Sequence, residues 1–140
     1  MTEDGSALVI PSQVVDEIVA HCLGVFPEEG CGLLSGDPAT GVVAQSYPTQ
    51  NAAHSAKRYV VEPRDHLRVD REAETEGHSI MGVYHSHTHT DPYPSPTDVA
   101  EAPDPTWHYV LVSLRHEVAA VRSYRIVDGT ITEEPIRSPA

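Results

Sequence analysis

Valine dominates the apolar residues of this chain, with 17 valines against 7 leucines. A side chain branched at Cβ loses rotamer freedom in a helix and packs well on the pleated surface of a strand. The surplus therefore favours a central sheet over a helical bundle. Because 140 residues are the size of one domain, we expect residues 1–140 to form a single α/β domain, with the polar residues 1–7 frayed.

Short apolar runs bounded by glycine, proline and polar turns mark the expected strands. These strands cover residues 8–10, 31–34, 41–47, 59–61, 80–85, 107–114, 117–127 and 130–136. Between the last two runs, Asp128 and Gly129 predict a tight hairpin turn.

Two helices are expected from apolar spacing and end signals. The first should begin with Ser12 as its N-cap and stop at Gly24, because residues 14–23 carry apolar i, i+4 rows. The second should follow Pro63 over residues 64–76. Since this segment is mostly polar, we expect it to lie on the surface.

Charge and cysteine content exclude several classes of protein. The formal net charge of −12 leaves no basic surface of the kind that nucleic acid or an anionic membrane requires. No stretch approaches about 18 consecutive apolar residues, and the N-terminus carries acids where a signal peptide carries positive charge. We therefore expect a cytoplasmic protein that binds neither nucleic acid nor membrane, with Cys22 and Cys31 as free thiols in the core.

Histidines gather at the end of the strand expected at residues 80–85, where His85, His87 and His89 occupy alternate positions. On an extended backbone alternate side chains share a face, so His85 and His87 can point both imidazoles at one metal ion. Asp98, which follows a proline-rich loop, is the candidate for a third ligand. Two imidazoles and one carboxylate leave the fourth position of a tetrahedral zinc ion open to water, which is typical of a catalytic site. The same set also describes the facial triad of non-haem iron oxygenases.

A hydrolytic zinc site also needs a base that takes a proton from water and passes it on. Glu28 and Glu29, beside a short glycine-flanked strand, are the candidates. Ser95, three residues before Asp98, can donate a hydrogen bond to the oxyanion that forms when water adds to a carbonyl.

This arrangement resembles the JAMM (MPN+) zinc metalloproteases. The pattern of that family is a glutamate, a long gap, His-x-His, seven residues, a serine, two residues and an aspartate, and the chain matches it with Glu29, His85, His87, Ser95 and Asp98. The resemblance implies one zinc ion per chain, held by the two histidines and the aspartate. It also implies that the glutamate is the general acid and base and that the serine stabilises the tetrahedral intermediate.

A second block of sequence supports the resemblance, which covers nearly the whole chain. Residues 27–34 read Pro-Glu-Glu-Gly-Cys-Gly-Leu-Leu and are similar to the segment around the family's glutamate, in a register that selects Glu29 over Glu28. The implied fold is the cytidine deaminase-like JAMM domain, a mixed and mostly antiparallel sheet flanked by helices. The chain departs from many members at Thr88, where they carry proline.

Within the family, the chain is most similar to small actinobacterial members that remove cysteine from the C-terminus of a ubiquitin-like sulfur-carrier protein. The similar stretches are residues 85–88, 93–95, 97–98, 108–113 and 122–129. The resemblance implies hydrolysis of a Gly-Cys bond on a carrier with a C-terminal Gly-Gly, in a thiocarboxylate-dependent route to cysteine. Relatives often self-associate, so a homodimer is one expectation, although no residue identifies its interface.

Three alternatives stay open at this point. A JAMM peptidase that matures another ubiquitin-like sulfur carrier or modifier would carry the same motif. A catalytically silent MPN scaffold usually lacks the histidines, and an iron oxygenase gives no reason for the block around Glu29. We expect His89 at the rim of the site and not on the metal, while Asn51 lies in a segment common in the family and has no assigned role.

Overall fold

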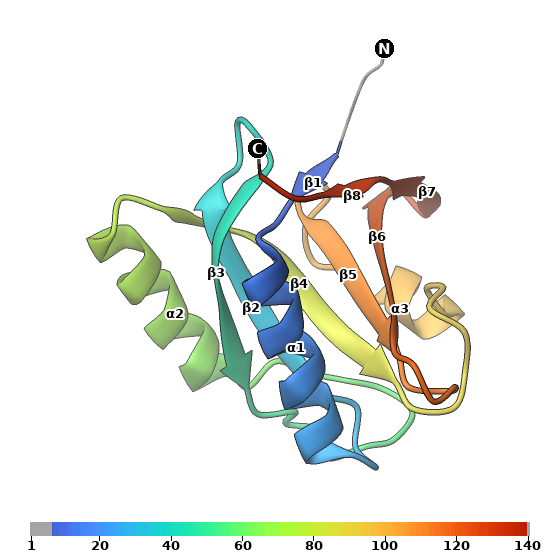
Figure 1. The fold of residues 1–140 in the computed structure, drawn as a ribbon. Coiled ribbons are helices and arrows are strands. Elements are labelled where there is room, and N and C mark those ends of the chain that lie inside the picture. The colour runs from blue at the N-terminus through green and yellow to red at the C-terminus, as the bar shows by residue number, and fades with distance from the viewer. Residues whose placement is uncertain (1–6, 140) are drawn as a thin grey trace.

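The computed structural model describes residues 7–139, so the expected fraying of residues 1–7 falls, apart from Ala7, outside the described residues. The elements in chain order are β1 (Leu8–Val9), α1 (Ser12–Val25), β2 (Cys31–Asp37), β3 (Val42–Thr49), α2 (Pro63–Thr75), β4 (Ser79–His87), α3 (Pro96–Ala100), β5 (His108–Ser113), β6 (Ala120–Val127), β7 (Thr130–Glu134) and β8 (Ile136–Arg137). Figure 1 shows the sheet through the middle of the molecule with the helices around it.

The strands form one eight-stranded sheet in the order β7-β6-β5-β4-β2-β3-β1-β8. The parallel neighbours are β4 with β5, β1 with β3, and β1 with β8, and the other pairs are antiparallel. Because β7 ends at Glu134 and β8 begins at Ile136, Pro135 alone connects the two opposite edges, and the sheet curls on itself (Figure 1). The predicted α/β class, with a mixed and mostly antiparallel sheet flanked by helices, is confirmed.

One face of the sheet packs against α1. Val14, Ile18 and Cys22, each four residues from the next, are the buried residues of this helix. They share a core cluster with Leu34 of β2 and Tyr84 of β4. A helix with a single apolar stripe buries that stripe against the sheet, so the i, i+4 row in the sequence marks the packed side of α1.

The opposite face carries α2 and α3 over a second core cluster. Leu33, Val83 and Leu111 of the sheet meet Val69 of α2 there. Only Val69 and Ala73 of α2 are buried, which confirms the prediction of a surface helix. His85 and His87, which follow Val83 at alternate positions of β4, have their side chains on this face as well.

The ends of α1 differ from the prediction. Pro11, not Ser12, stands at the N-cap, and the carbonyl oxygen of Pro11 accepts the N–H groups of Val14 and Val15 without a side-chain cap. Gly24 does not adopt the positive φ of a terminating glycine, so the helix runs on to Val25. Among residues 7–139, no helix has both the length and the apolar content that crossing a membrane requires.

The prediction of a strand at residues 59–61 is wrong. That segment makes a single bridge, between Val61 and Asn51. The N–H of Val60 donates to the side chain of Asn51, and its carbonyl accepts from Ala52. Its backbone groups are therefore satisfied inside a loop and not by a neighbouring strand.

The hairpin predicted at Asp128 and Gly129 is confirmed between β6 and β7. The two residues have φ values of 50° and 79°. Positive φ at both central positions matches the right-handed twist of the flanking strands.

Candidate active site

His85 and His87 lie at the end of β4, and strand alternation turns both imidazoles toward the face that carries α3. Asp98 reaches the same point from α3. Its Oδ2 lies 3.2 Å from Nε2 of His85 and 3.0 Å from Nε2 of His87. All three side chains are buried, and one ligand atom of each lies within 4.8 Å of the others. The structure thus brings together the three residues predicted to bind metal.

A capping box at the start of α3 holds Asp98 in position. The Oγ of Ser95 accepts the backbone N–H of Asp98 at 3.1 Å, and Oδ2 of Asp98 accepts the backbone N–H of Ser95 at 2.8 Å. Pro96 occupies the first turn, where its fixed φ suits a helix start. Because the Ser95 hydroxyl accepts in this box, its hydrogen stays available for another acceptor.

Neighbouring groups orient the two imidazoles. The carbonyl oxygen of Asp91 lies 2.8 Å from Nδ1 of His87. A carbonyl only accepts, so Nδ1 donates and Nε2 is the nitrogen available to a metal. Tyr59 stacks on the ring of His85 with centroids 4.1 Å apart, which limits the ring's rotation.

The donor set fits a divalent metal ion. Both ring nitrogens of His85 are buried, and apart from the 3.2 Å approach of Nε2 to Oδ2 of Asp98, which lacks hydrogen-bond geometry, neither has a polar partner among the residues that the structure describes. Burial lowers the pKa of His85 and so favours the neutral imidazole that binds metal. Burial works against ionisation of Asp98, but the closeness of His85 and His87 outweighs it and holds the pKa of Asp98 well below its usual range. Two nitrogens and one carboxylate oxygen are the three-ligand set of catalytic zinc sites.

Glu29 lies two residues before β2, next to the end of β4. Cys31 pairs with His85, and Gly30 and Ser86 exchange backbone and side-chain hydrogen bonds, so one further step of the same register places Glu29 beside His87. The residue is 4% exposed, and within residues 7–139 its Oε1 has no hydrogen-bond partner. Burial raises the pKa of Glu29 to about 8, with the nearby Asp98 adding to the rise and His87 opposing it.

Asn51 ties the segment before α2 to Glu29. Its Nδ2 donates to the carbonyl oxygens of Glu29 and Arg58, both at 3.0 Å. Its Oδ1 accepts the N–H groups of Ala53 and Val60, also at 3.0 Å. The residue whose role the sequence left open therefore holds the backbone around Glu29.

His89 and Cys31 lie outside the cluster, as predicted. His89 is exposed, and its Nδ1 lies 2.8 Å from the hydroxyl of Thr88. Cys31 is buried and free, and burial raises the pKa of its thiol to about 11. A thiol with so high a pKa carries almost no thiolate at neutral pH, so it is a poor nucleophile. Cys22 is also buried and free.

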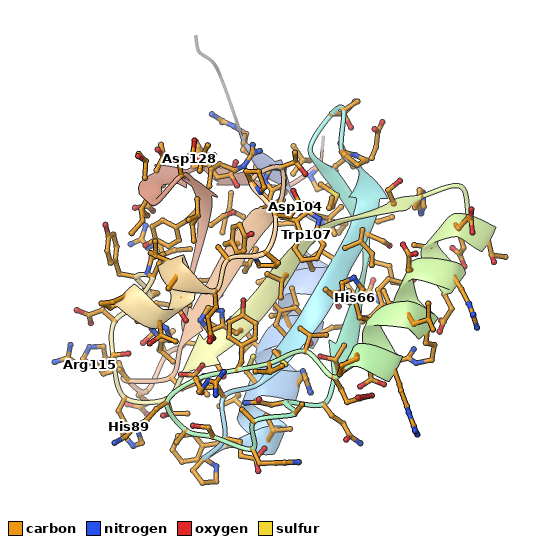
Figure 2. The ribbon with its side chains drawn as sticks, turned by 180° about the vertical axis from the view of Figure 1, so that it is seen from behind. His66, His89, Asp104, Trp107, Arg115 and Asp128 are labelled. Atoms are coloured by element: carbon orange, nitrogen blue, oxygen red, sulfur yellow. The ribbon has the colours of Figure 1, made fainter. Side chains whose placement is uncertain are left out.

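One hollow reaches the His-His-Asp cluster through His87, and a second hollow lies behind Tyr59 without any residue of the cluster in its lining. A mainly apolar hollow of about 400 Å³ includes Tyr59, the ring stacked on His85. Figure 2 shows His66 of α2 and Trp107, just before β5; both line this hollow, with ring centroids 5.9 Å apart. A polar hollow of about 520 Å³ is lined by His87, His89, Thr90, Asp91, Tyr93, Ser95 and Arg115. The sequence predicted no role in the site for Tyr59, Asp91 or Arg115, since no local pattern marks a residue that a loop brings to a site.

The family follows from a match over most of the chain. Residues 11–127 match the model described as prokaryotic homologs of the JAB domain. The chain belongs to this family. The resemblance to the JAMM proteases predicted from the motif spacing is thereby confirmed, because it is the same domain.

Named relatives are peptidases that act on protein conjugates. The chain is 43% identical over 133 residues to the CysO-cysteine peptidase of Mycobacterium tuberculosis, covering 92% of this chain and 89% of the relative. It is 33% identical over 113 residues to the desampylase of Haloferax volcanii, covering 77% of this chain and 81% of the relative.

Solved structures have the same fold. A protein of Desulfitobacterium hafniense superposes with a TM-score of 0.87 at 28% identity, over 94% of this chain and 92% of that one. A JAB1/MPN domain protein of Archaeoglobus fulgidus superposes with a TM-score of 0.62 at 19% identity, over 94% of this chain and 99% of that one. The latter match concerns the fold alone.

Proposed function

We propose that the protein is a zinc-dependent peptidase that hydrolyses the Gly-Cys bond at the C-terminus of a ubiquitin-like sulfur-carrier protein and releases cysteine. The observation that carries this proposal is the buried cluster of His85, His87 and Asp98, with ligand atoms within 4.8 Å, beside a buried carboxyl of raised pKa on Glu29. The resemblance to the CysO-cysteine peptidase over 92% of the chain supplies the substrate class.

The metal part of the proposal takes one zinc ion per chain. His85, His87 and Asp98 would hold it through two nitrogens and one carboxylate oxygen. When bound, a zinc ion in such a site polarises a carbonyl and lowers the pKa of water.

Glu29 is the proposed proton carrier. Hydrolysis joins the oxygen of water to the glycine carbonyl carbon, breaks the C–N bond and requires a proton on the departing amine. The unpartnered Oε1 of Glu29 can take a proton from water and deliver it to that nitrogen. Burial raises the pKa of Glu29 to about 8 without a metal ion, and a cation held by the His-His-Asp cluster would lower it toward the neutral range in which a carboxyl both takes and gives protons.

Ser95 is the proposed donor to the oxyanion. Its Oγ accepts the N–H of Asp98 and is held at the start of α3, while its own hydrogen can point at the oxygen that gains charge. A hydrogen bond that is fixed before the reaction stabilises that charge without reorganisation.

The two hollows suit the two sides of the scissile bond. The mainly apolar hollow, whose lining includes Tyr59 but none of the three cluster residues, suits the acyl segment of a carrier that ends in Gly-Gly. The polar hollow beside His87 and Ser95 suits the amine side. The proposal places this reaction in the cytoplasm and in one domain formed by residues 1–140.

Intact-mass analysis of a carrier ending in Gly-Gly-Cys tests the proposal. Zinc-loaded protein should remove one cysteine, whereas chelator-treated protein and Glu29→Gln should not. Glu28→Gln is the matched control, because the neighbouring Glu28 is partly exposed beside His54 and should keep activity.

Three outcomes would contradict parts of the proposal. Normal turnover by Glu29→Gln refutes the role of that carboxyl. Zinc-bound protein that leaves the carrier intact but cleaves another ubiquitin-like protein refutes the substrate. A protein that binds no metal refutes the enzyme and favours a silent scaffold.

A further inference from the structure

Arg115 lines the polar hollow together with His87 and Ser95. Figure 2 shows Arg115 and His89 at the end of the sheet where β4 ends. Arg58 lines the mainly apolar hollow instead and pairs with Glu101. The polar hollow is thus lined by a guanidinium and by two proposed site residues.

The sheet dictates this position. Because β4 and β5 are parallel neighbours, the residues that follow them emerge at the same end, and His87 is paired with Ser113. The N–H of Leu114 donates to the carbonyl oxygen of His87 at 2.9 Å. The Oγ of Ser113 donates to the carbonyl oxygen of Thr90 at 2.6 Å. The backbone therefore brings Arg115 to the same end of the sheet as the proposed metal-binding residues.

The guanidinium keeps most of its hydrogen-bonding capacity. Its Nη1 lies 2.8 Å from Oδ1 of Asp91, and the two side chains are 48% and 68% exposed. Exposed ion pairs of this kind are weak and open readily. A guanidinium has five N–H donors in a planar fork that matches a carboxylate, so Arg115 can bind a second carboxylate with the groups that Asp91 leaves unused.

We propose that Arg115 binds the free α-carboxylate of the amino acid that leaves from the carrier's C-terminus. This inference rests on the proposed function, because it concerns the amine side of the same bond. In a Gly-Cys bond the carboxylate is separated from the leaving nitrogen by one carbon atom, so it lies in the hollow next to the cluster. The amine of a lysine side chain in an isopeptide bond carries no carboxylate there.

The contact would make the enzyme select a terminal amino acid over an isopeptide-linked protein. Asp91 has the opposite effect, since its carboxylate competes for the guanidinium and repels the carboxylate of the substrate. Both residues lie at the rim of the hollow, and neither belongs to the His-His-Asp cluster.

Two matched substrates test the inference: a carrier ending in Gly-Gly-Cys with a free carboxylate, and the same carrier with a C-terminal amide. We expect wild-type protein to prefer the carboxylate. Arg115→Gln should lose at least about tenfold in kcat/KM on the carboxylate, mostly through KM, and less than about threefold on the amide. Arg115→Lys should recover part of the preference, because it keeps the charge but not the fork.

Two further variants separate recognition from a structural role. Arg68→Gln is the matched control, because Arg68 is also 48% exposed and pairs with Glu72 at 2.9 Å, but on α2. It should leave both substrates unchanged. Asp91→Asn should lower KM for the carboxylate and not for the amide.

The possible failures can be told apart. Equal losses on both substrates in Arg115→Gln, or no loss on either, overturn the inference, as does a wild-type protein that cleaves the two substrates equally well. A wild-type protein that cleaves neither overturns the proposed function and this inference with it. Equal effects of Asp91→Asn on both substrates also count against a guanidinium shared between Asp91 and the substrate carboxylate.

Discussion

Burial of Glu29 predicts an unusual dependence of stability on pH in the metal-free protein. The pKa of this carboxyl rises from an ordinary value of 4.5 to about 8 in the folded state. The folded state therefore holds a proton that the unfolded state releases between these two values. The contribution of Glu29 to stability is fully present below pH 4.5 and is lost as the pH rises toward 8.

The size of the effect follows from the shift. One pKa unit corresponds to about 1.4 kcal/mol, so the loss that wild-type protein suffers grows from about 1 kcal/mol at pH 5 to about 3 kcal/mol at pH 7. Glutamine cannot ionise, so Glu29→Gln does not suffer this loss. Relative to wild type, the variant should gain about 2 kcal/mol in its free energy of unfolding between pH 5 and pH 7.

Urea unfolding of chelator-treated protein at the two pH values measures this difference. Other groups titrate in both proteins, so their contributions largely cancel in the comparison. Glu28→Gln removes the same charge from the adjacent, partly exposed side chain and is the control. A gap between wild type and Glu29→Gln that stays constant with pH would refute the reasoning, as would an equal pH-dependent gap in Glu28→Gln.

Three further substitutions follow from the geometry of the site. In competition with a chelating dye, His87→Ala should weaken zinc binding by more than about 100-fold, a larger loss than residues that only support the ligands cause. His89→Ala should bind zinc as wild type does. Equal zinc binding by the two variants would contradict the ligand assignment. Asn51→Ala should lower the free energy of unfolding by about 2 to 4 kcal/mol, because four backbone groups, one buried and three part-buried, lose their hydrogen bonds. A loss below about 1 kcal/mol in urea unfolding would show that water replaces the side chain. Ser95→Ala should lower the free energy of unfolding by about 1 kcal/mol, because it removes the cap of α3, and should lower the rate of cleavage about 100-fold. Ser95→Asp should keep the cap and still lose cleavage. Recovery of activity in Ser95→Asp would contradict the proposed role.

The parts of the site that the sequence predicted rest on short-range geometry. His85 and His87 share a face because side chains alternate along any strand. Ser95 and Asp98 form a capping box because residues three apart meet at a helix start. The turn at Asp128 and Gly129 follows in the same way from the φ values that these residues tolerate.

Predictions failed where long-range contacts compete with local pattern. The apolar run at residues 59–61 reads as a strand, but the side chain of Asn51 satisfies Val60 and makes the segment a loop. That loop places the ring of Tyr59 on His85. A residue nine positions away decided the conformation, and no local propensity contains that contact.

By itself, the sequence determined the family, the sheet-rich class and the set of proposed metal-binding side chains, because motif spacing and strand alternation act over a few residues. Only the tertiary structure decided the chemical state and the surroundings of that set. The pKa of Glu29 rises because β2 pairs with β4 and buries a carboxyl that its neighbours in sequence would leave in water. Arg115 reaches the site because β4 and β5 are parallel. Burial and the pairing of distant strands depend on the whole chain. Burial sets the pKa of Glu29, and strand pairing sets the position of Arg115, on which the proposed choice of substrate rests.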